Sequence, residues 1–252
     1  MAELSQAAKE YNPSGFRANE LERSRDVDRL DFNPNLHVGM PAPDFTVTGL
    51  DGKRSRLSDY LGKKHVVFEF GCITAPVFVN DIVALNYLHA RYRDEEIQFL
   101  AVYAREAHPG KNYPAHTAFE QKLAHARDLQ RLENVQFPVV VDSLEGEAHR
   151  LYGLRPSPVY MVNKEGLIVY KASWLIPDEL DLALGQLVHA EQWKAMGRRP
   201  LRQVYSELWA GVWINRSVHE RVFERAGKGA REDVARAFGF DPVTGQKTKK
   251  EN

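Results

Sequence analysis

The sequence predicts an α/β domain, because a buried strand runs into a helix that is followed by a second buried strand. Residues 65–70 are β-branched and aromatic, which is typical of a buried strand. Gly71 breaks this strand, and Pro76 stands where the first turn of a helix tolerates proline. Apolar residues recur at helical spacing over 78–92, and residues 99–103 form the next strand. The crossover of this unit is expected to be right-handed.

Turn signals and hydrophobic periodicity predict the elements around this unit. In chain order they are a short strand over 45–47, a helix around 119–129, a core strand over 137–142, an antiparallel hairpin over 159–170 and a helix over 180–188. Parallel strands first, a hairpin last and a proline before the hairpin make up the thioredoxin arrangement. The predicted fold is therefore thioredoxin-like, with a central mixed sheet flanked by helices.

In that fold the proline ahead of the hairpin is cis and faces the active turn, and Pro158 is the candidate here. We expect the thioredoxin-like domain over residues 37–190. An N-terminal arm over 1–36 precedes it, and a helical C-terminal extension over 191–245 follows it, with a disordered tail over 246–252. The arm either lies over the domain or a partner subunit, or is partly disordered.

The C-terminal extension is too apolar for a free tail. Its helical faces are expected at 201–212, at 218–226 and at 230–238, and it carries Trp193, Trp209 and Trp213. Such a segment packs on the domain or builds a dimer contact, so a homodimer is compatible with the sequence.

Composition excludes several classes of partner. There are 34 acidic and 34 basic residues, so no net field favours nucleic acid or a membrane surface. The N-terminus shows no signal peptide and no stretch of about 18 apolar residues, which favours a cytoplasmic protein. Cys72 is the single cysteine, so an intramolecular disulfide is impossible. The histidines 37, 65, 89, 125 and 149 show no metal-ligand spacing, and no glycine-rich phosphate loop is present, so no metal or cofactor is expected.

Three motifs in order resemble the iodothyronine deiodinases and, more closely, their bacterial deiodinase-like relatives among the redoxins. The family turn Gly-Ser-x-Thr-Sec/Cys-Pro-x-Phe is matched by Gly71, Thr74, Pro76 and Phe78. The family motif Tyr-x-x-Glu-Ala-His-Pro is matched by Tyr103, Glu106, Ala107, His108 and Pro109. A second family histidine, which follows a proline, resembles His116 after Pro114. The resemblance covers about residues 38–180.

The resemblance implies a reductive dehalogenation in which a selenolate or thiolate attacks iodine and acid groups protonate the leaving carbon. Glu106 and His108 would form the proton relay, a type of group commonly worth about 10² to 10⁴ in rate. His116 would bind a phenolic hydroxyl, with Tyr103 and Pro158 also on the substrate side. The implied partners are a small aromatic or halogenated phenolic substrate and a thiol reductant.

Two departures from the family pattern affect this chemistry. The position of the selenocysteine or cysteine nucleophile is Ala75, which has no attacking atom. The family's basic residue in the turn after the hairpin is not reproduced, since the sequence there reads Tyr-Lys-Ala-Ser-Trp over 170–174. The membrane anchor of the vertebrate enzymes is also missing.

Three readings of this deiodinase-like redoxin stay open. In the first, Ala75 replaces a native nucleophile by engineering. In the second, Ala75 is natural and Cys72, three residues earlier, carries single-thiol redox chemistry such as peroxide reduction; the alternative for Cys72, which cysteine's tendency to be buried favours, is a structural role. In the third, the chain is a non-catalytic binding protein for a small aromatic ligand or a protein. Thr74 either caps the following helix or hydrogen-bonds a nucleophile at position 75.

Overall fold

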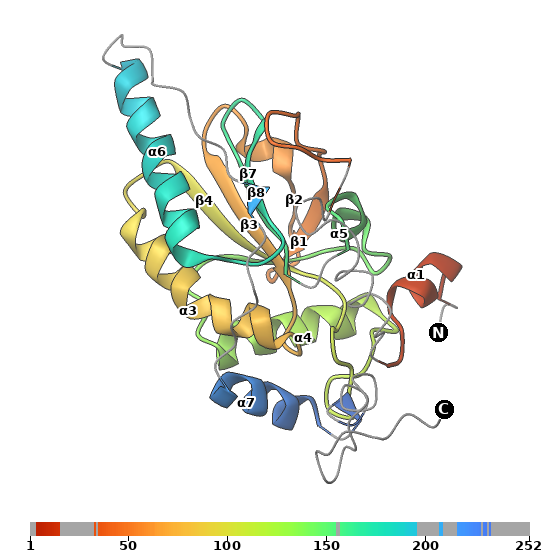
Figure 1. Ribbon diagram of the computed structural model, residues 1–252. Helices are drawn as coiled ribbons and strands as arrows, with labels where there is room; N and C mark the ends of the chain where they lie inside the picture. Colours follow the sequence, from red (N-terminus) through yellow and green to blue (C-terminus); the bar gives the residue numbers. More distant parts are fainter. Residues whose placement is uncertain are drawn as a thin grey trace, which may run out of the picture.

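A computed structural model of the chain describes residues 4–15, 33, 35–154, 157–195, 207–208, 216–227, 229–230 and 232. Its centre is one mixed sheet whose strands lie in the order β2-β1-β5-β4-β3-β6-β7-β8 (Figure 1). The strands are β1 (Thr46–Gly49), β2 (Arg54–Arg56), β3 (His65–Gly71), β4 (Ile97–Tyr103), β5 (Val139–Val141), β6 (Val159–Val162), β7 (Ile168–Ala172) and β8 (Glu207–Leu208).

The pairing of the strands confirms the predicted thioredoxin-like order. Strand β4 lies between β3 and β5 and is parallel to both, and β6 and β7 form an antiparallel hairpin on the other side of β3. The helices are α1 (Gln6–Tyr11), the 3₁₀ helix η1 (Leu57–Tyr60), α3 (Pro76–Arg91), α4 (Phe119–Leu132), α5 (Glu147–Leu151), α6 (Pro177–Ala195) and α7 (Arg216–Ala226). Each long helix therefore lies where periodicity predicts one.

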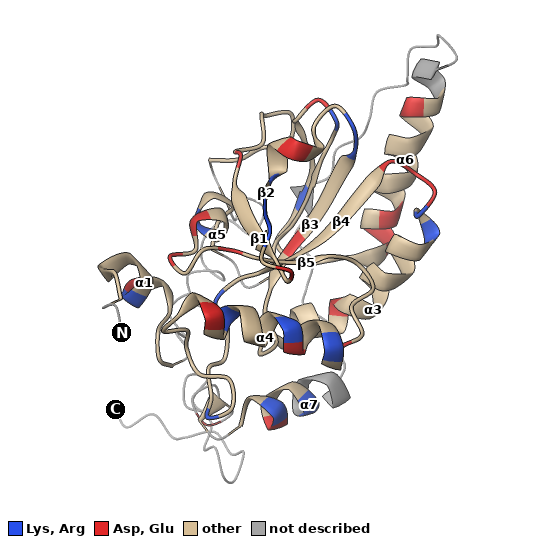
Figure 2. Ribbon diagram, turned by 180° about the vertical axis from the view of Figure 1, so that it is seen from behind, with Lys and Arg blue, Asp and Glu red and all other residues tan. Residues whose placement is uncertain are grey.

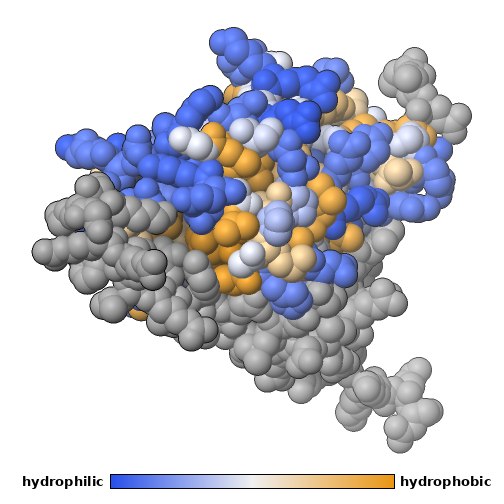
Figure 3. All heavy atoms as spheres, turned by 90° about the horizontal axis from the view of Figure 1, so that it is seen from above, coloured by the Kyte–Doolittle hydropathy of each residue, from blue (hydrophilic) through white to orange (hydrophobic). Residues whose placement is uncertain are grey.

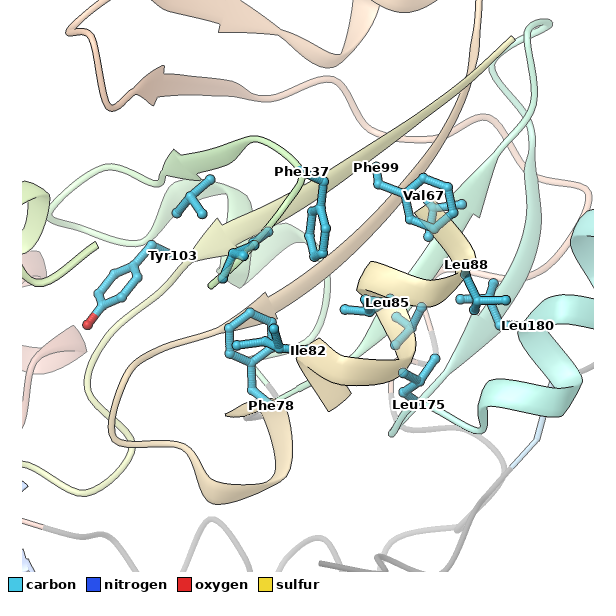
Figure 4. Packing of buried hydrophobic residues seen from close by; sticks show 14 of the residues in the cluster. Val67, Phe78, Ile82, Leu85, Leu88, Phe99, Tyr103, Phe137, Leu175 and Leu180 are labelled. Atoms are coloured by element: carbon cyan, nitrogen blue, oxygen red, sulfur yellow. The ribbon is translucent and has the colours of Figure 1, made fainter. Parts of the chain in front are cut away.

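The alternating side chains of the sheet build a core on each face. One face packs against α3, α4 and α6, and Figure 4 shows Phe78, Ile82 and Leu85 of α3 against this side. The other face, which includes Phe68 and Phe70, packs against η1 and α5. Because both faces of β3 are covered, all seven of its residues are buried.

Charge on the outer surface is mixed. Lys and Arg lie among Asp and Glu along α4 and α7 (Figure 2), and in the view from above polar residues surround smaller apolar areas (Figure 3). None of the helices described is both long enough and apolar enough to cross a membrane. The surface thus agrees with the balanced composition.

Two expectations about the backbone are wrong. The Ser157–Pro158 bond is trans, not cis. The trans form is favoured by about 0.5–1 kcal/mol in any X–Pro bond, and here the Pro158 carbonyl already accepts a hydrogen bond from the Phe70 amide at 3.2 Å. Leu208, expected on a helix, lies in β8, because its segment pairs with β7 in parallel and satisfies that edge of the sheet.

The chain ends are partly described. In the N-terminal arm, α1 packs on the domain with Tyr11 buried. In the C-terminal extension, α7 confirms the helix expected over 218–226 and contacts α3. Helices were also expected over 201–212 and 230–238, but apart from residues 207–208, 230 and 232 these ranges lie outside the described residues. The side chains of Trp193, Trp209 and Trp213 and the tail 246–252 lie outside them as well.

Candidate functional site

The turn between β3 and α3 places Ala75 at the start of a helix. Ala75 is the N-cap residue of α3, with Pro76 in the first turn, and no side chain caps the helix there. The methyl group of Ala75 is buried, at 2% exposure. The free amide groups and the positive dipole end of a helix of 16 residues therefore meet a side chain with no charge or lone pair to stabilise.

Thr74 joins this turn to the loop that follows β4. Its hydroxyl donates a hydrogen bond to Oε2 of Glu106 at 2.5 Å and accepts one from the amide of His108 at 3.2 Å. Both alternatives for Thr74 required its hydroxyl, and the structure commits that hydroxyl to Glu106 rather than to a helix cap. The side chain beside position 75 is thus held by a buried carboxylate.

Glu106 is the centre of the polar cluster. Its Oε1 accepts a hydrogen bond from the Tyr103 hydroxyl at 2.6 Å, and it lies 3.1 Å from Nε2 of His116 and 2.9 Å from Nδ1 of His125. Burial alone would raise the pKa of Glu106, but the hydrogen bonds and charges of the two histidines outweigh it and lower that pKa. Glu106 is therefore a carboxylate at neutral pH, while burial lowers the pKa of His116.

Cys72 is buried in the turn, as are its neighbours from Gly71 to Ala75. Its side chain is buried, its Sγ accepts a hydrogen bond from the amide of Ala107 at 3.1 Å, and the Thr74 hydroxyl is 3.4 Å away. Burial first, and then the charge of Glu106, raise the pKa of the Cys72 thiol. The thiol is therefore protonated at neutral pH, which is the opposite of what a reactive cysteine needs.

Two of the predicted site residues, His108 and Pro158, contact their neighbours here through backbone atoms. His108 reaches the turn through its backbone amide, while its ring packs on Phe223 of α7 with 4.9 Å between ring centroids. Pro158 is buried beside β3 and contributes its carbonyl to the Phe70 amide. The structure thus joins Thr74, Tyr103, Glu106 and His116 directly, whereas His108 contacts this group through its backbone amide and Pro158 has its hydrogen bond to β3.

A cavity of about 910 Å³ opens next to the cluster. Its walls come from the N-terminal arm, the loop after β4 and the C-terminal segment, and they include Lys9, Asn12, Pro109, His116, Thr117 and Gly229. The His116 ring itself is fully buried, so it faces Glu106 and not the open space. Segments far apart in the sequence therefore combine to form this cavity, which shares His116 with the polar cluster.

A family model described as iodothyronine deiodinase matches residues 11–178 of the chain. The chain belongs to the iodothyronine deiodinase family. It is 32% identical over 148 residues to the thyroxine 5-deiodinase of Gallus gallus, which covers 54% of this chain and 57% of the chicken protein. The corresponding protein of Rattus norvegicus is 30% identical over 154 residues, covering 57% of this chain and 50% of the rat protein. The chain spans about half the length of these curated relatives.

Solved structures confirm the fold of this deiodinase-family chain. An uncharacterized conserved protein from Geobacillus kaustophilus superimposes with a TM-score of 0.53 at 19% identity, over 68% of this chain and 88% of that one. A thiol:disulfide interchange protein from Bacteroides sp. superimposes with a TM-score of 0.50 at 18% identity, over 61% of this chain and 91% of that one. The family match begins at residue 11, so it includes part of the arm that the motifs alone left outside.

Sequence reasoning missed one member of this deiodinase-family cluster. His125 lies on α4, nine residues after His116, and its Nδ1 is 3.2 Å from Nε2 of His116. No short motif joins the two, since a loop separates His116 from α4. The available signal was the helix itself: His125 precedes the core residues Ala126 and Leu129 on the face of α4 that turns inward. Together with Glu106, these histidines form a set of donors that could hold a metal ion.

Proposed function

We propose that this chain is a deiodinase-like redox scaffold that binds a phenolic or halogenated aromatic ligand without reducing it. The observation that carries the proposal is the 2.5 Å hydrogen bond from Thr74 to Glu106, directly before Ala75. The polar groups of a reductive site are in place beside a position that offers only a methyl group. Without an attacking atom, the network can orient a ligand but cannot complete a reduction.

The reaction that a thiolate or selenolate at position 75 would carry out requires an attacking atom that Ala75 does not have. A thiolate there would attack iodine, so that a sulfur–iodine bond forms, the carbon–iodine bond breaks and the carbon takes up a proton. Two thiol groups of a reductant would then return the sulfur to a thiol, releasing iodide and a disulfide. Because Glu106 is ionised, its part would be to accept the hydrogen bond that fixes the Thr74 hydroxyl, one residue before position 75.

Single-thiol chemistry at Cys72 has less support. A nucleophilic cysteine has a lowered pKa, whereas burial and the charge of Glu106 raise the pKa of the Cys72 thiol. Its Sγ already accepts the Ala107 amide and so satisfies a backbone donor. We therefore assign Cys72 a structural role in the turn.

The test is Ala75→Cys with thyroxine as substrate and dithiothreitol as reductant. The substituted thiol, at the start of α3, is expected to have a lowered pKa and to release iodide, whereas the parent protein releases none. Ala75→Ser is the matched control and should stay inactive. Thr74→Val in the Ala75→Cys background should slow release by roughly 10². Release of iodide by the parent, or an inert thiol at position 75, would contradict the proposal.

Binding is measured separately on the parent chain. Isothermal titration with thyroxine should give saturable binding, and the same titration with Ala75→Cys should give a similar affinity, because the substitution adds one sulfur atom and leaves the cavity walls unchanged. If thyroxine shows no saturable binding, the proposal that the chain binds an iodinated phenol is wrong. The iodide-release assay still tests separately whether position 75 is the site of the nucleophile.

A further inference from the structure

Three donor atoms converge inside the polar cluster. Oε1 of Glu106, Nε2 of His116 and Nδ1 of His125 form a nearly equilateral triangle with sides of 3.1, 2.9 and 3.2 Å. The side chains of Glu106 and His116 are fully buried, and that of His125 is 10% exposed. Water therefore contributes little to satisfying these atoms. Tyr103 donates to Oε1 of Glu106, whereas among the described residues the two nitrogens have hydrogen-bond contacts only with each other and with that oxygen.

Hydrogen bonds alone cannot satisfy all three sides of this triangle. If both imidazole nitrogens carry protons that point at the carboxylate, the side between Nε2 and Nδ1 brings two donors together at 3.2 Å. If one nitrogen gives up its proton, that nitrogen presents a lone pair either to the carboxylate oxygen or to a shared donor. One side remains unfavourable in each arrangement, because an imidazole nitrogen cannot donate and accept at once.

A cation satisfies all three atoms together. Metal–nitrogen and metal–oxygen bonds of about 2.0–2.2 Å place neighbouring ligand atoms roughly 2.8–3.1 Å apart in octahedral geometry and roughly 3.3–3.6 Å apart in tetrahedral geometry. Of the three observed separations, 2.9 and 3.1 Å lie within the octahedral range and 3.2 Å lies just above it. We propose that Glu106, His116 and His125 bind one divalent first-row transition-metal ion, as a site of two imidazoles and one carboxylate with the remaining positions open.

The surroundings of the triangle suit such a site. Tyr103 donates to the ligating oxygen of Glu106, and Thr74 donates to the other oxygen, so both ends of the carboxylate are oriented. His125 is fixed by α4 and packs against Tyr113, with 4.9 Å between ring centroids. The triangle shares one residue, His116, with the wall of the neighbouring cavity. The inference does not depend on position 75 or on the ligand class proposed above.

The experiment uses the full chain without an affinity tag, dialysed against a chelator and then freed of it. Titration with Zn²⁺ is expected to give one equivalent bound per chain, checked by elemental analysis after gel filtration. Titration with Co²⁺ is expected to give visible d–d absorption that Zn²⁺ abolishes. A stoichiometry near zero, or Co²⁺ spectra identical to those of the free ion, would overturn the proposal.

Substitutions distinguish the loss of a metal ligand from a general loss of structure as the cause of weaker Zn²⁺ binding. His125→Gln should weaken Zn²⁺ binding by more than about 100-fold, and Tyr103→Phe by about 10–100-fold, as expected for a group that orients a ligand. His149→Gln is the matched control: His149 is equally buried and hydrogen-bonded, to Tyr11 at 2.8 Å, but lies outside the triangle. It should keep one equivalent of Zn²⁺ even if it unfolds at lower temperature. Equal loss in His149→Gln and His125→Gln would contradict the assignment.

Discussion

At the scale of single residues, Glu69 is out of keeping with its surroundings. It lies within β3, is 1% exposed and faces the apolar side that packs against α3. Neither of its carboxylate oxygens has a hydrogen-bond partner within the part of the chain that the structure describes. Burial first, and then the charge of Asp81 on α3, raise the pKa of Glu69 well above its ordinary value, and burial raises the pKa of Asp81 to about 7. The folded state therefore disfavours the charged forms of both groups.

Glu69→Gln should stabilise the protein in a pH-dependent way. Because the folded-state pKa of Glu69 is raised, the unfolded chain loses this proton at lower pH than the folded chain, and stability falls as pH rises above about 4.5. At pH 8 the substitution is expected to raise the free energy of unfolding by about 1–3 kcal/mol, and at pH 4 by close to zero. Urea unfolding at both pH values measures this. Glu95→Gln, on an exposed residue, should show no such trend, and a pH-independent effect of Glu69→Gln would contradict the argument.

The sequence predicted which residues form the site better than it predicted their burial and their pKa values. Motif spacing brought together Thr74, Tyr103, Glu106 and His116, which the structure places in contact. Redox chemistry at Cys72 requires a thiol of low pKa, but Cys72 belongs to the core, where burial raises its pKa. Burial depth and the meeting of His116 with His125 depend on tertiary packing, which no local pattern in the sequence encodes.

At the scale of elements, Gly71 explains how β3 can turn into α3 so closely. A Cβ atom on Gly71 would overlap the ring of Phe78, one turn into the helix, although the backbone conformation itself suits other residues. Phe78 is fully buried and belongs to the core between the sheet and α3 (Figure 4). The pair sets the distance between the end of the strand and the start of the helix, and hence the position of residue 75.

Gly71→Ala should therefore destabilise the protein through overpacking alone. We expect a loss of about 1–3 kcal/mol in the free energy of unfolding, measured by chemical denaturation. In a double-mutant cycle with Phe78→Leu, the loss caused by Gly71→Ala should shrink, because the smaller side chain leaves room for the methyl group. Strictly additive effects would show that the two residues do not compete for space.

Elements were predictable in proportion to their length. The helices α3, α4 and α6 carry several turns of periodic apolar residues, and each was predicted within a few residues of where it begins. The short elements α1, α5 and β8 were missed, since six, five and two residues hold too little pattern to detect. The trans bond before Pro158 was mispredicted because the fold, not the local sequence, supplied the expectation.

At the scale of the whole molecule, the N-terminal arm closes one end of the domain. Tyr11 of α1 is 1% exposed, its hydroxyl is 2.8 Å from Nδ1 of His149 on α5, and it accepts the amide of Arg105 at 3.3 Å. Its ring fills the space beside Gly146, where a Cβ atom would overlap it. Of the alternatives for the arm, packing on the domain holds for α1, which lies against α5 in Figure 1.

The contribution of the arm to global stability can be measured at Tyr11. Tyr11→Ala should lower the free energy of unfolding by about 3–5 kcal/mol, as for other buried aromatic side chains, because it empties the space beside Gly146. Tyr11→Phe keeps the ring and should lose about 0.5–1.5 kcal/mol for the hydroxyl contacts. Tyr87→Ala, on a tyrosine that is 62% exposed on α3, is the matched control and should change stability little. If Tyr11→Ala behaves like Tyr87→Ala, the arm is not part of the cooperative fold. The arm residues that line the cavity beside His116 would then pack there without contributing to global stability.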